Sequence, residues 1–356
     1  MTSTATFRNR DNIRWGIIGC GDVTEIKSGP GFQKAANSQL VAVMRRQAAL
    51  AEDYARRHGV PRWYGDAKAL IRDPEVDAVY VATPPGTHCE FALKICAAGK
   101  PAYIEKPMAR TAAECERMVQ AFTEAQLPLF VAYYRRALPR FVKARELIET
   151  GRLGRLTQVR YQYSEARHLT VRADKLPWRL NAEDAGGGLF LDLGSHTLDI
   201  LDFMLGPLTD VEGTAANLAS PYEVEDAVVM SFRTAAGVPG LASWNFAGAV
   251  PDDTICFTGT AGRVSLSTFG TEPVRWETED GVREFDLPNP PHVAQPMIQK
   301  VVEELLGRGT CPSTGETALR TARVMDRVLD SYYGGRRDAF WLRPESWPGR
   351  PSTPHR

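Results

Sequence analysis

The sequence predicts an α/β protein with two domains, a doubly wound parallel sheet followed by a mostly antiparallel α/β domain. Two observations predict the first domain: short apolar segments alternate with helical segments, and a glycine-rich turn directly follows the first apolar segment. One observation predicts the second domain. The later strand-like segments follow one another without helices between them, which favours antiparallel pairing.

The alternation of strands and helices extends from residue 14 to residue 132. Apolar strands are expected at 14–19, 40–44, 78–82, 102–104 and 129–132, with helices at 23–36, 47–58, 67–71, 87–98 and 112–125. Gly29, Pro30 and Gly31 interrupt the first helix. Strands this apolar, separated by helices, are typical of a parallel sheet that is covered on both faces.

The turn after the first strand reads GCGDVT. It has the first two glycines of the dinucleotide-binding pattern G-x-G-x-x-G. Thr24 replaces the third glycine, which implies slightly looser packing between the strand and the following helix. Gly19 allows the tight turn, and Gly21 lets a pyrophosphate approach the main chain at a helix N-terminus. Because the turn ends the first strand of an alternating series, it favours dinucleotide binding over a turn without a ligand. We expect Asp22 and Val23 to contact the cofactor as well.

The end of the second strand predicts which nicotinamide cofactor binds. An NAD site typically has an acidic residue here for the ribose hydroxyls, whereas an arginine suits the 2′-phosphate of NADP. This chain has Arg45 and Arg46 and no carboxylate. Because two guanidinium groups offer forked donors to a phosphate, we expect NADP(H) to be preferred, with NAD(H) as the alternative. If no ligand binds here, the two arginines simply form a basic turn that is exposed to solvent.

Two further strands end in polar motifs, TPPGTH and EKP. Ligands of doubly wound folds bind beyond the carboxyl ends of the strands, so cofactor contacts are expected from Thr83, Pro84, His88, Glu105 and Lys106. A lysine at this edge can be an ordinary surface charge. Near a nicotinamide it can instead hydrogen-bond the reacting oxygen, with its pKa lowered by partial burial.

A glycine run opens the apolar helical segment DAGGGLFLDLGSHTLDILDFMLG. Asp192, His196 and Asp199 are spaced four and three residues apart, which places them on one face of a helix. Burying a row of ionisable side chains costs free energy unless the side chains are paired or face a cavity. The helix alone leaves two readings open: the floor of an active site with His196 as proton-transfer group, or a core histidine tied to Asp192. A metal site is disfavoured because the sequence has no second His or Cys cluster.

The rest of the chain predicts the second domain and the domain boundaries. Strands are expected at 156–163, 211–217, 227–233, 241–246, 254–258 and 263–266, and helices at 139–150, 294–306 and 316–332. The expected organisation is a flexible tail over 1–12, a dinucleotide-binding domain over 13–134, a substrate domain over 135–342 and a flexible tail over 343–356.

Charge and cysteine content limit the expected partners. The 43 Lys and Arg residues balance the 43 Asp and Glu residues, so neither nucleic acid nor an anionic membrane is expected to bind. The six cysteines are scattered without zinc spacing, as in the reduced thiols of a cytoplasmic protein. No apolar run approaches the roughly 18 residues of a membrane span, and the polar N-terminus does not read as a secretory signal.

Four segments together resemble the Gfo/Idh/MocA oxidoreductases: WGIIGCGDV, DAVYVATPPGTH, YIEKPMA and AGGGLFLDLGSHTLDILDFMLG. They occur in the family's order and spacing across most of the chain. Within the family, the chain is similar to the NADP-dependent 1,5-anhydrofructose reductases, which have comparable WRL and VED segments, here beginning at Trp178 and Val224. The resemblance implies a Rossmann domain and then an α/β domain whose large, open, mostly antiparallel sheet commonly mediates oligomerisation, so a homodimer or homotetramer is expected.

The resemblance also implies roles for single residues. Lys106 matches the lysine of the EKP motif, which binds the substrate oxygen near the nicotinamide. Asp192 and His196 match the acidic residue and the catalytic histidine of the glycine-run helix. Matched cofactor contacts are Gly19, Gly21, Arg45, Thr83, Pro84 and Glu105. Tyr133 and Tyr134 stand where many members have Asn or His, which leaves the substrate less defined.

The candidate substrate contacts combine aromatic faces with forked donors, which suit a polyhydroxylated ring. They are Tyr134, Arg136, Tyr163, Trp178, Arg179 and Asp192, with Tyr161, Arg167 and His168 close to them in the sequence. Each of these residues, taken singly, is more often an ordinary residue of a sheet or loop.

The expected activity is hydride transfer between NADP(H) and a carbinol or carbonyl carbon of a sugar, anhydro-sugar or polyol. His196, with an ordinary pKa of about 6.5, suits proton transfer in either direction at neutral pH. Lys106 suits the stabilisation of negative charge on the substrate oxygen. Two alternatives stay open: a redox-neutral enzyme of the same fold that cleaves glycosidic bonds, and a non-catalytic NADPH-binding regulator.

Overall fold

The computed structural model describes residues 7, 10–166, 176–337 and 339–351. Contacts divide the chain into two compact units. The first comprises Met1–Ala109, Glu114–Leu138 and Asn289–Leu319, and the second comprises Arg110–Ala113, Pro139–Pro288 and Arg320–Arg356. The sequence predicted one continuous second domain over 135–342, whereas the contacts return Asn289–Leu319 to the first unit.

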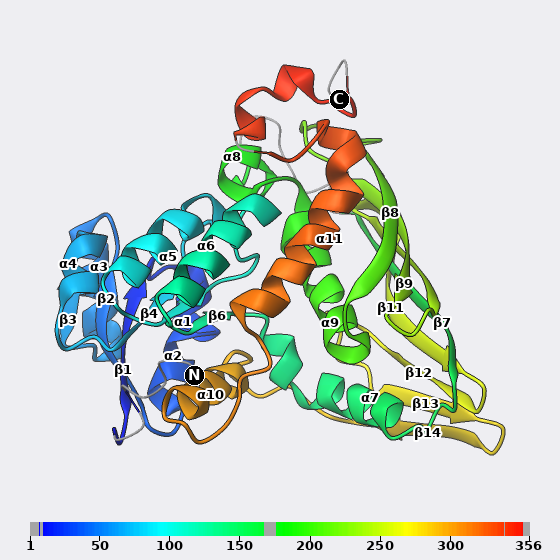
Figure 1. Ribbon diagram of the computed structural model, residues 1–356, viewed down its shortest axis with the longest axis horizontal. Helices are drawn as coiled ribbons and strands as arrows, with labels where there is room; N and C mark the ends of the chain where they lie inside the picture. Colours follow the sequence, from blue (N-terminus) through cyan, green and yellow to red (C-terminus); the bar gives the residue numbers. More distant parts are fainter. Residues whose placement is uncertain (1–6, 8–9, 167–175, 338, 352–356) are drawn as a thin grey trace. The chain divides into compact units, whose positions relative to one another are not determined.

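The first unit is built on a six-stranded parallel sheet with the order β3-β2-β1-β4-β5-β6 (Figure 1). Its strands are β1 Ile13–Ile18, β2 Ser38–Met44, β3 Arg62–Tyr64, β4 Ala78–Val81, β5 Ala102–Ile104 and β6 Leu129–Val131. This is the order of two βαβαβ halves that meet at β1 and β4. The inner strands are almost wholly buried, which explains their apolar sequences. The edge strand β3 is half-exposed, so it lacked that signal and was not predicted.

Helices connect these strands, and one helix from the last third of the chain joins them. They are α1 Asp22–Ile26, α2 Gly29–Lys34, α3 Ala48–His58, α4 Ala67–Arg72, α5 His88–Ala97, most of α6 Ala112–Glu124 and α10 Gln295–Leu305, with short 3₁₀ turns η2 Pro85–Thr87 and η3 Tyr134–Ala137. Met297, Ile298 and Val301 of α10 are buried in the same apolar core as Trp15 and Phe32. This packing explains why Asn289–Leu319 belongs to the first unit.

The single helix predicted over 23–36 is two helices, α1 and α2. A Cβ atom at Gly29 would collide with the carbonyl oxygen of Thr24, so the two short helices approach each other through a glycine. Thr24 is fully buried, and its hydroxyl donates to the carbonyl oxygen of Gly21 at 2.7 Å. The side chain at the third position of the glycine motif is therefore buried and hydrogen-bonded within the turn, and the looser strand–helix packing stays a prediction.

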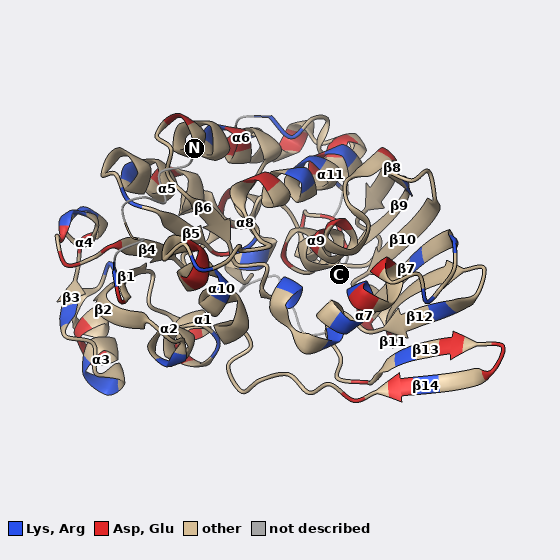
Figure 2. Cartoon of the chain, turned by 60° about the horizontal axis from the view of Figure 1, so that its bottom comes forward, with Lys and Arg blue, Asp and Glu red and all other residues tan. Residues whose placement is uncertain are grey.

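The second unit is built on an eight-stranded sheet with the order β14-β13-β12-β11-β7-β10-β9-β8. Its strands are β7 Leu156–Ala166, β8 Leu208–Ala216, β9 Ala227–Thr234, β10 Pro239–Asn245, β11 Ala247–Gly259, β12 Gly262–Leu266, β13 Val274–Thr278 and β14 Gly281–Phe285. All neighbours pair antiparallel except β7 and β10, which run parallel. The hairpin of β13 and β14 was not predicted, because its strands are rich in charged residues (Figure 2).

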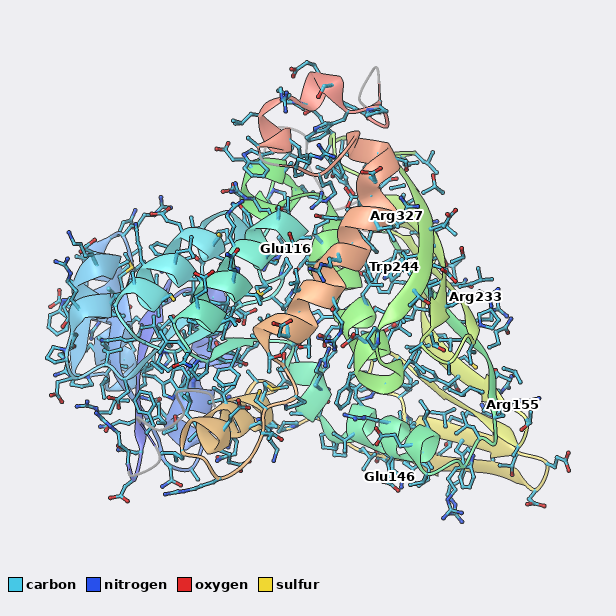
Figure 3. The ribbon with its side chains drawn as sticks, in the orientation of Figure 1. Glu116, Glu146, Arg155, Arg233, Trp244 and Arg327 are labelled. Atoms are coloured by element: carbon cyan, nitrogen blue, oxygen red, sulfur yellow. The ribbon has the colours of Figure 1, made fainter. Side chains whose placement is uncertain are left out.

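Helices of the second unit pack on one face of this sheet (Figure 1). They are α7 Pro139–Glu149, α8 Ala182–Ala185, α9 Ser195–Leu205 and most of α11 Gly315–Tyr333, with short turns η5 Trp178–Leu180, η6 Phe190–Gly194, η7 Phe340–Leu342 and η8 Pro344–Ser346. Exposure alternates along β9, as expected for a strand with one buried face. Trp244 of β10, labelled in Figure 3, packs on Phe190 and Tyr161 with ring centroids 4.8 and 5.3 Å apart.

Residues near both ends of the chain make specific contacts. Phe7 is buried in the core of the first unit, and Arg10 pairs with Asp77 at 2.7 Å. Trp347 is buried, and its indole N–H donates to the carbonyl oxygen of Phe340 at 3.1 Å. These contacts differ from the flexible tails that the sequence predicted over 1–12 and 343–356.

The structure confirms the predicted fold class, a Rossmann-type parallel sheet followed by an α/β domain with a large, mostly antiparallel sheet. Charged side chains of both signs are spread over both units (Figure 2). Among the residues that the structure describes, no helix combines the length and the apolar character needed to cross a bilayer.

Candidate active site

The glycine turn of the first unit has open space in front of its main chain. Gly19 has a φ of +91°, and a Cβ atom there would lie 2.7 Å from the Thr83 methyl group, so only glycine fits. At Gly21 the nearest atom to an added Cβ would be the Gly19 carbonyl oxygen, 4.0 Å away. Asp22 and Val23 form the first turn of α1 directly after it. This arrangement fits the approach of a pyrophosphate to the main chain.

The second strand ends against this turn. The main-chain N–H groups of Gly19 and Cys20 both donate to the carbonyl oxygen of Met44, at 2.9 and 3.2 Å. Arg45 and Arg46 therefore begin beside the glycine turn, and both side chains are exposed. No carboxylate among the described residues pairs with either guanidinium. The turn thus has two cations at the position that distinguishes NADP from NAD.

His88 ties together the loops that follow β4 and β5. It is fully buried, with Nε2 lying 2.7 Å from the carbonyl oxygen of Thr83 and Nδ1 lying 3.1 Å from that of Pro107. Burial lowers the pKa of this imidazole. The Thr87 hydroxyl closes the first loop by donating to Thr83 Oγ1 at 2.7 Å and to the Pro84 carbonyl oxygen at 3.1 Å. His88 thus braces the two loops, and the cofactor contact expected from the sequence stays a prediction.

Glu105 and Lys106 follow β5 directly, and Lys106 is half-buried. One carboxylate oxygen of Glu105 accepts the O–H of Tyr80, and the other accepts the main-chain N–H of Lys106 at 3.0 Å. Burial raises the pKa of Glu105, while the Tyr80 hydrogen bond and the charge of Lys106 act against that rise. Glu105, which the sequence predicts to contact the cofactor, thus supports the main chain of the loop that carries Lys106.

In the second unit, Asp192 lies in a π-helical turn and not in the α-helix that the sequence predicted. This turn spans Phe190–Gly194, and α9 begins at Ser195. The Asp192 carboxylate pairs with Arg179 at 3.1 Å, and the Arg179 guanidinium lies 4.4 Å from the ring centroid of Trp178. Three predicted substrate contacts are therefore brought together at a partly exposed position.

His196 lies in the first turn of α9 and is 5% exposed. Its ring meets the ring of Phe269 edge to face with centroids 6.0 Å apart, and Phe269 also packs on Tyr163 at 5.5 Å. Leu193, Phe269 and Tyr163 all line a cavity of about 910 Å³. The π-helical turn before α9 therefore borders a cavity with an aromatic wall, and His196 packs on Phe269 of that wall. The cavity is of the size that small-molecule sites have.

A tightly held loop presents Phe269 to this cavity. The Asp253 carboxylate accepts the main-chain N–H groups of Thr268 at 3.0 Å and of Phe269 at 2.6 Å. Arg140 of α7 donates to the carbonyl oxygen of Glu272 at 2.9 Å. Because main-chain groups on both sides of the aromatic ring are hydrogen-bonded, the ring has a defined position beside the histidine.

The glycine run before the π-helical turn is held by Glu225. Its buried carboxylate accepts the N–H of Gly188 at 3.0 Å and the O–H of Tyr333. Burial raises the pKa of Glu225. A Cβ atom at Gly188 would collide with the Glu225 main chain, so close approach requires this glycine. The Arg336 side chain donates to the carbonyl oxygen of Gly186, the first glycine of the run, at 2.6 Å.

Two predicted substrate contacts lie in the first unit. Arg136 is buried and donates to the carbonyl oxygen of Pro312 at 3.0 Å. The Tyr134 hydroxyl accepts a hydrogen bond from Arg135 at 3.0 Å. The bond to Pro312 holds the Arg136 side chain in place, and the substrate contacts expected from Arg136 and Tyr134 stay predictions.

The described residues assemble no metal centre: none of their His, Cys, Asp and Glu side chains form a group of three or more that could hold an ion. Asp199, which the sequence placed on the same helix face as His196, is buried in α9. Arg167 and His168, named as neighbours of the substrate contacts, lie outside the described residues.

Sequence analysis missed three residues that shape these sites. Tyr80 holds Glu105 from within an apolar strand, and Phe269 packs on His196 from an irregular loop, so neither belonged to a motif. Glu225 was visible in the VED segment, but its partner Gly188 is 37 residues away in the chain. Contacts this distant leave no spacing pattern in the sequence.

Two family models match the chain. Residues 13–133 match the model described as oxidoreductase family, NAD-binding Rossmann fold, and residues 141–265 match the GFO/IDH/MocA C-terminal domain. Together they cover both units in the order that the family has.

Related proteins match over most of the chain. Oxidoreductase P35 of Formosa agariphila is 36% identical over 317 residues, which are 88% of this chain and 97% of that protein. The trans-1,2-dihydrobenzene-1,2-diol dehydrogenase of Mus musculus is 30% identical over 259 residues, 71% of this chain and 74% of that protein. The 1,5-anhydro-D-fructose reductase of Ensifer adhaerens is 31% identical over 227 residues, 63% of this chain and 67% of that protein.

Solved structures share the fold. Levoglucosan dehydrogenase in complex with NADH and levoglucosan superposes with a TM-score of 0.81 at 22% identity, covering 90% of this chain and 97% of that one. The aldose-aldose oxidoreductase from Caulobacter crescentus complexed with glycerol gives a TM-score of 0.78 at 24% identity, covering 88% and 95%. From the matched models, the 36% identical relative and the motifs on both units, the chain belongs to the Gfo/Idh/MocA family of oxidoreductases with an NAD-binding Rossmann fold.

Proposed function

We propose that the protein transfers a hydride reversibly between NADP(H) and a carbinol or carbonyl carbon of a sugar, anhydro-sugar or polyol. Two observations carry this proposal: the first unit has a dinucleotide turn, and in the second unit His196 packs on Phe269, which lines an aromatic-walled cavity. Relatives named as a 1,5-anhydro-D-fructose reductase and as dihydrodiol dehydrogenases support oxidoreduction at a hydroxylated carbon.

The preference for NADP(H) over NAD(H) is part of the proposal. Its support is the position of Arg45 and Arg46, which follow directly on the strand end that is hydrogen-bonded to the glycine turn. Exposed guanidinium groups suit the bidentate hydrogen bonding of a phosphate. The further proposed cofactor contacts are Gly19, Gly21, Asp22, Val23, Thr83, Pro84 and Lys106.

The proposed chemistry divides the work between three side chains. The nicotinamide, when bound, supplies or accepts the hydride, and the substrate oxygen gains or loses one proton in the same reaction. Lys106 stabilises negative charge on that oxygen, and His196 gives or takes its proton. Asp192, paired with Arg179, orients the substrate or the imidazole. Tyr163 and Trp178 offer aromatic faces to the substrate ring.

The decisive experiment is an assay of sugars, anhydro-sugars, inositols and dicarbonyls with NADPH, NADH and their oxidised forms. We expect a stoichiometric change in nicotinamide absorbance with at least one substrate, and a higher kcat/KM with the NADP pair. Substrate consumption without net nicotinamide turnover would identify the redox-neutral alternative. Tight NADPH binding with no turnover across the panel would favour the regulator.

We also propose a homodimer or homotetramer in the cytoplasm. Val229 and Leu241 expose 51% and 53% of their surface on the side of the sheet that faces away from the core, where both line a hollow of about 690 Å³. Apolar residues gathered on a strand face suit burial against another copy. The six free cysteines suit a reducing compartment.

A further inference from the structure

A side-chain hydrogen bond ties the loop of Lys106 to the strand beside it. Strands β4 and β5 pair in parallel, with Tyr80 opposite Tyr103. At the carboxyl ends of these strands, the Tyr80 hydroxyl donates to one oxygen of Glu105, and the Lys106 main-chain N–H donates to the other oxygen at 3.0 Å. One carboxylate therefore joins a core residue of the sheet to the main chain of the lysine.

The Tyr80 side chain has little freedom to move. It is 0% exposed, and its ring packs on Phe32 and Tyr103 with centroid distances of 5.0 and 5.1 Å. Because protein interiors are close-packed, these neighbours determine where the ring lies. Its hydroxyl consequently donates from a defined position.

Groups on several elements influence whether Glu105 is ionised. The surrounding protein favours the neutral carboxyl group and raises its pKa, whereas the Tyr80 hydrogen bond lowers it most, followed by the charge of Lys106 in the same loop and of Lys27 between α1 and α2. Tyr103 also faces the carboxylate. A donor stabilises the ionised form of a carboxyl group. Removing the Tyr80 hydroxyl should therefore raise the pKa of Glu105.

We infer that Tyr80 is a positioning residue for Lys106: its hydroxyl holds one oxygen of Glu105, and the other oxygen anchors the main chain from which the lysine projects. A charged acceptor binds a main-chain N–H more strongly than a neutral one. The inference rests on the proposed role of Lys106 in turnover. Lys106 makes the contact with the substrate, and Tyr80 acts only through Glu105.

The substitution Tyr80→Phe tests this role, and Tyr103→Phe is the matched control. Both remove one buried phenol hydroxyl from the same aromatic cluster, on paired positions of adjacent strands. Only the Tyr80 hydroxyl donates to Glu105, while the Tyr103 hydroxyl has no hydrogen-bond partner among the described residues. A general loss of packing or polarity would affect both variants alike.

The first readout is the pKa of Glu105 in the protein without cofactor. It can be followed by carbon-13 NMR of labelled glutamate side chains, with the resonance assigned by its loss in Glu105→Gln. We expect the pKa in Tyr80→Phe to be higher than in the wild type, because the hydroxyl that stabilises the ionised carboxylate is gone. In Tyr103→Phe it should stay at the wild-type value.

The second readout is the pH dependence of kcat. With the Glu105 pKa raised, the acidic limb of the kcat profile should move to higher pH in Tyr80→Phe and stay in place in Tyr103→Phe. The Kd of NADPH should stay at the wild-type value. His196 can also titrate on the acidic limb, so Tyr80→Phe is repeated in Glu105→Gln. There it should have no further effect, because no ionisable carboxyl group is left to stabilise.

Equal Glu105 pKa values in the wild type and in Tyr80→Phe would overturn the inference, as would equal kcat profiles for Tyr80→Phe and Tyr103→Phe. If Tyr80→Phe does not fold, Glu105→Gln decides alone, since an acidic limb unchanged from the wild type would also overturn it. Lys106→Met separates this failure from that of the proposed function. Full turnover in Lys106→Met would refute the role of the lysine, whereas the NMR titration still reports on Tyr80 and Glu105.

Discussion

His196 lies on the first turn of α9, 5% exposed, with the edge of Phe269 against its ring. Phe269 also lines the cavity of about 910 Å³, so the histidine packs directly behind its wall, and imidazole is the side chain most often used for proton transfer. We expect His196→Ala to lower kcat by roughly two to four orders of magnitude. The Kd of NADPH should barely change, because the residue is assigned to the substrate and not to the cofactor. Steady-state assays and fluorescence titration with NADPH measure the two quantities.

His292→Ala is the control for this substitution. Its imidazole lies in the first unit, with Nδ1 2.8 Å from the carbonyl oxygen of Ile26 and Nε2 2.8 Å from Lys34 Nζ. We expect wild-type kcat in this variant. Wild-type turnover in His196→Ala would instead favour the reading of a core histidine.

Arg45 carries the proposed cofactor preference. Arg45→Ala removes one forked donor beside the glycine turn, and a lost hydrogen bond to a charged group costs about 1.5–3 kcal/mol. We therefore expect the Kd of NADPH to rise by roughly one to two orders of magnitude, with little change for NADH. Isothermal titration calorimetry with both cofactors measures the difference.

Arg56→Ala controls for the loss of a surface cation. Arg56 lies on α3 of the same unit, is 76% exposed and pairs with Asp53 at 2.7 Å. Its loss should leave both affinities unchanged. Equal weakening of NADPH and NADH in Arg45→Ala would show that the arginine does not read the 2′-phosphate.

At the scale of single elements, the glycine run shows why a motif has its composition. Gly188 approaches the main chain of Glu225 too closely for any side chain, and the π-helical turn Phe190–Gly194 then presents Asp192 to Arg179. The sequence spacing alone indicated a regular helix. A π-helical turn depends on packing around it, so residue spacing cannot reveal it.

Glu225→Ala should destabilise this element. Its loss leaves the buried N–H of Gly188 and the O–H of Tyr333 without their acceptor. An unsatisfied buried donor costs about 1–3 kcal/mol, so we expect the free energy of unfolding to fall by roughly 2 kcal/mol or more. Chemical denaturation followed by circular dichroism measures this change.

Glu223→Ala provides the comparison two residues away. The Glu223 side chain is 42% exposed and pairs with Arg350. Exposed ion pairs contribute about 0–1 kcal/mol, so this variant should unfold nearly as the wild type does. Equal losses in the two variants would contradict the supporting role of the buried carboxylate.

At the scale of the whole molecule, the two units differ in how they depend on distant segments. The first unit is completed by α10, whose Met297 and Val301 enter the core of a sheet that ends more than 150 residues earlier in the chain. The second unit has a sheet with exposed apolar residues on its outer face. That face is where the proposed assembly can be tested.

Leu241→Glu places a charge on this outer face. If two copies bury the face, the buried charge should weaken association by at least roughly tenfold, because 1.4 kcal/mol corresponds to one order of magnitude. Analytical ultracentrifugation over a concentration series should show a shift from dimer or tetramer towards monomer. Val282→Glu on β14 is the control, since Val282 is 52% exposed but does not line the same hollow. An unchanged assembly in Leu241→Glu would place the interface elsewhere.

The sequence by itself determined the fold class and the set of candidate functional groups. Residues that are adjacent in the sequence were enough to recognise the alternation of apolar strands with helices and the turn at Gly19 and Gly21. The same holds for the two arginines after β2. Local patterns of this kind are visible along the chain because burial imposes a period on apolar residues. The motifs around Lys106 and His196 were also visible, since their residues lie close together in the sequence.

Only the tertiary structure decided which residues hold that chemistry in place. Tyr80 meets Glu105, Glu225 meets Gly188, and Phe269 meets His196 across separations of 25 residues or more. It also showed that His88 and Arg136 bond main-chain carbonyl groups, which their sequence motifs do not reveal. Such pairings arise because a buried polar group must find a partner wherever the packed chain brings one, and that place is set by the whole fold.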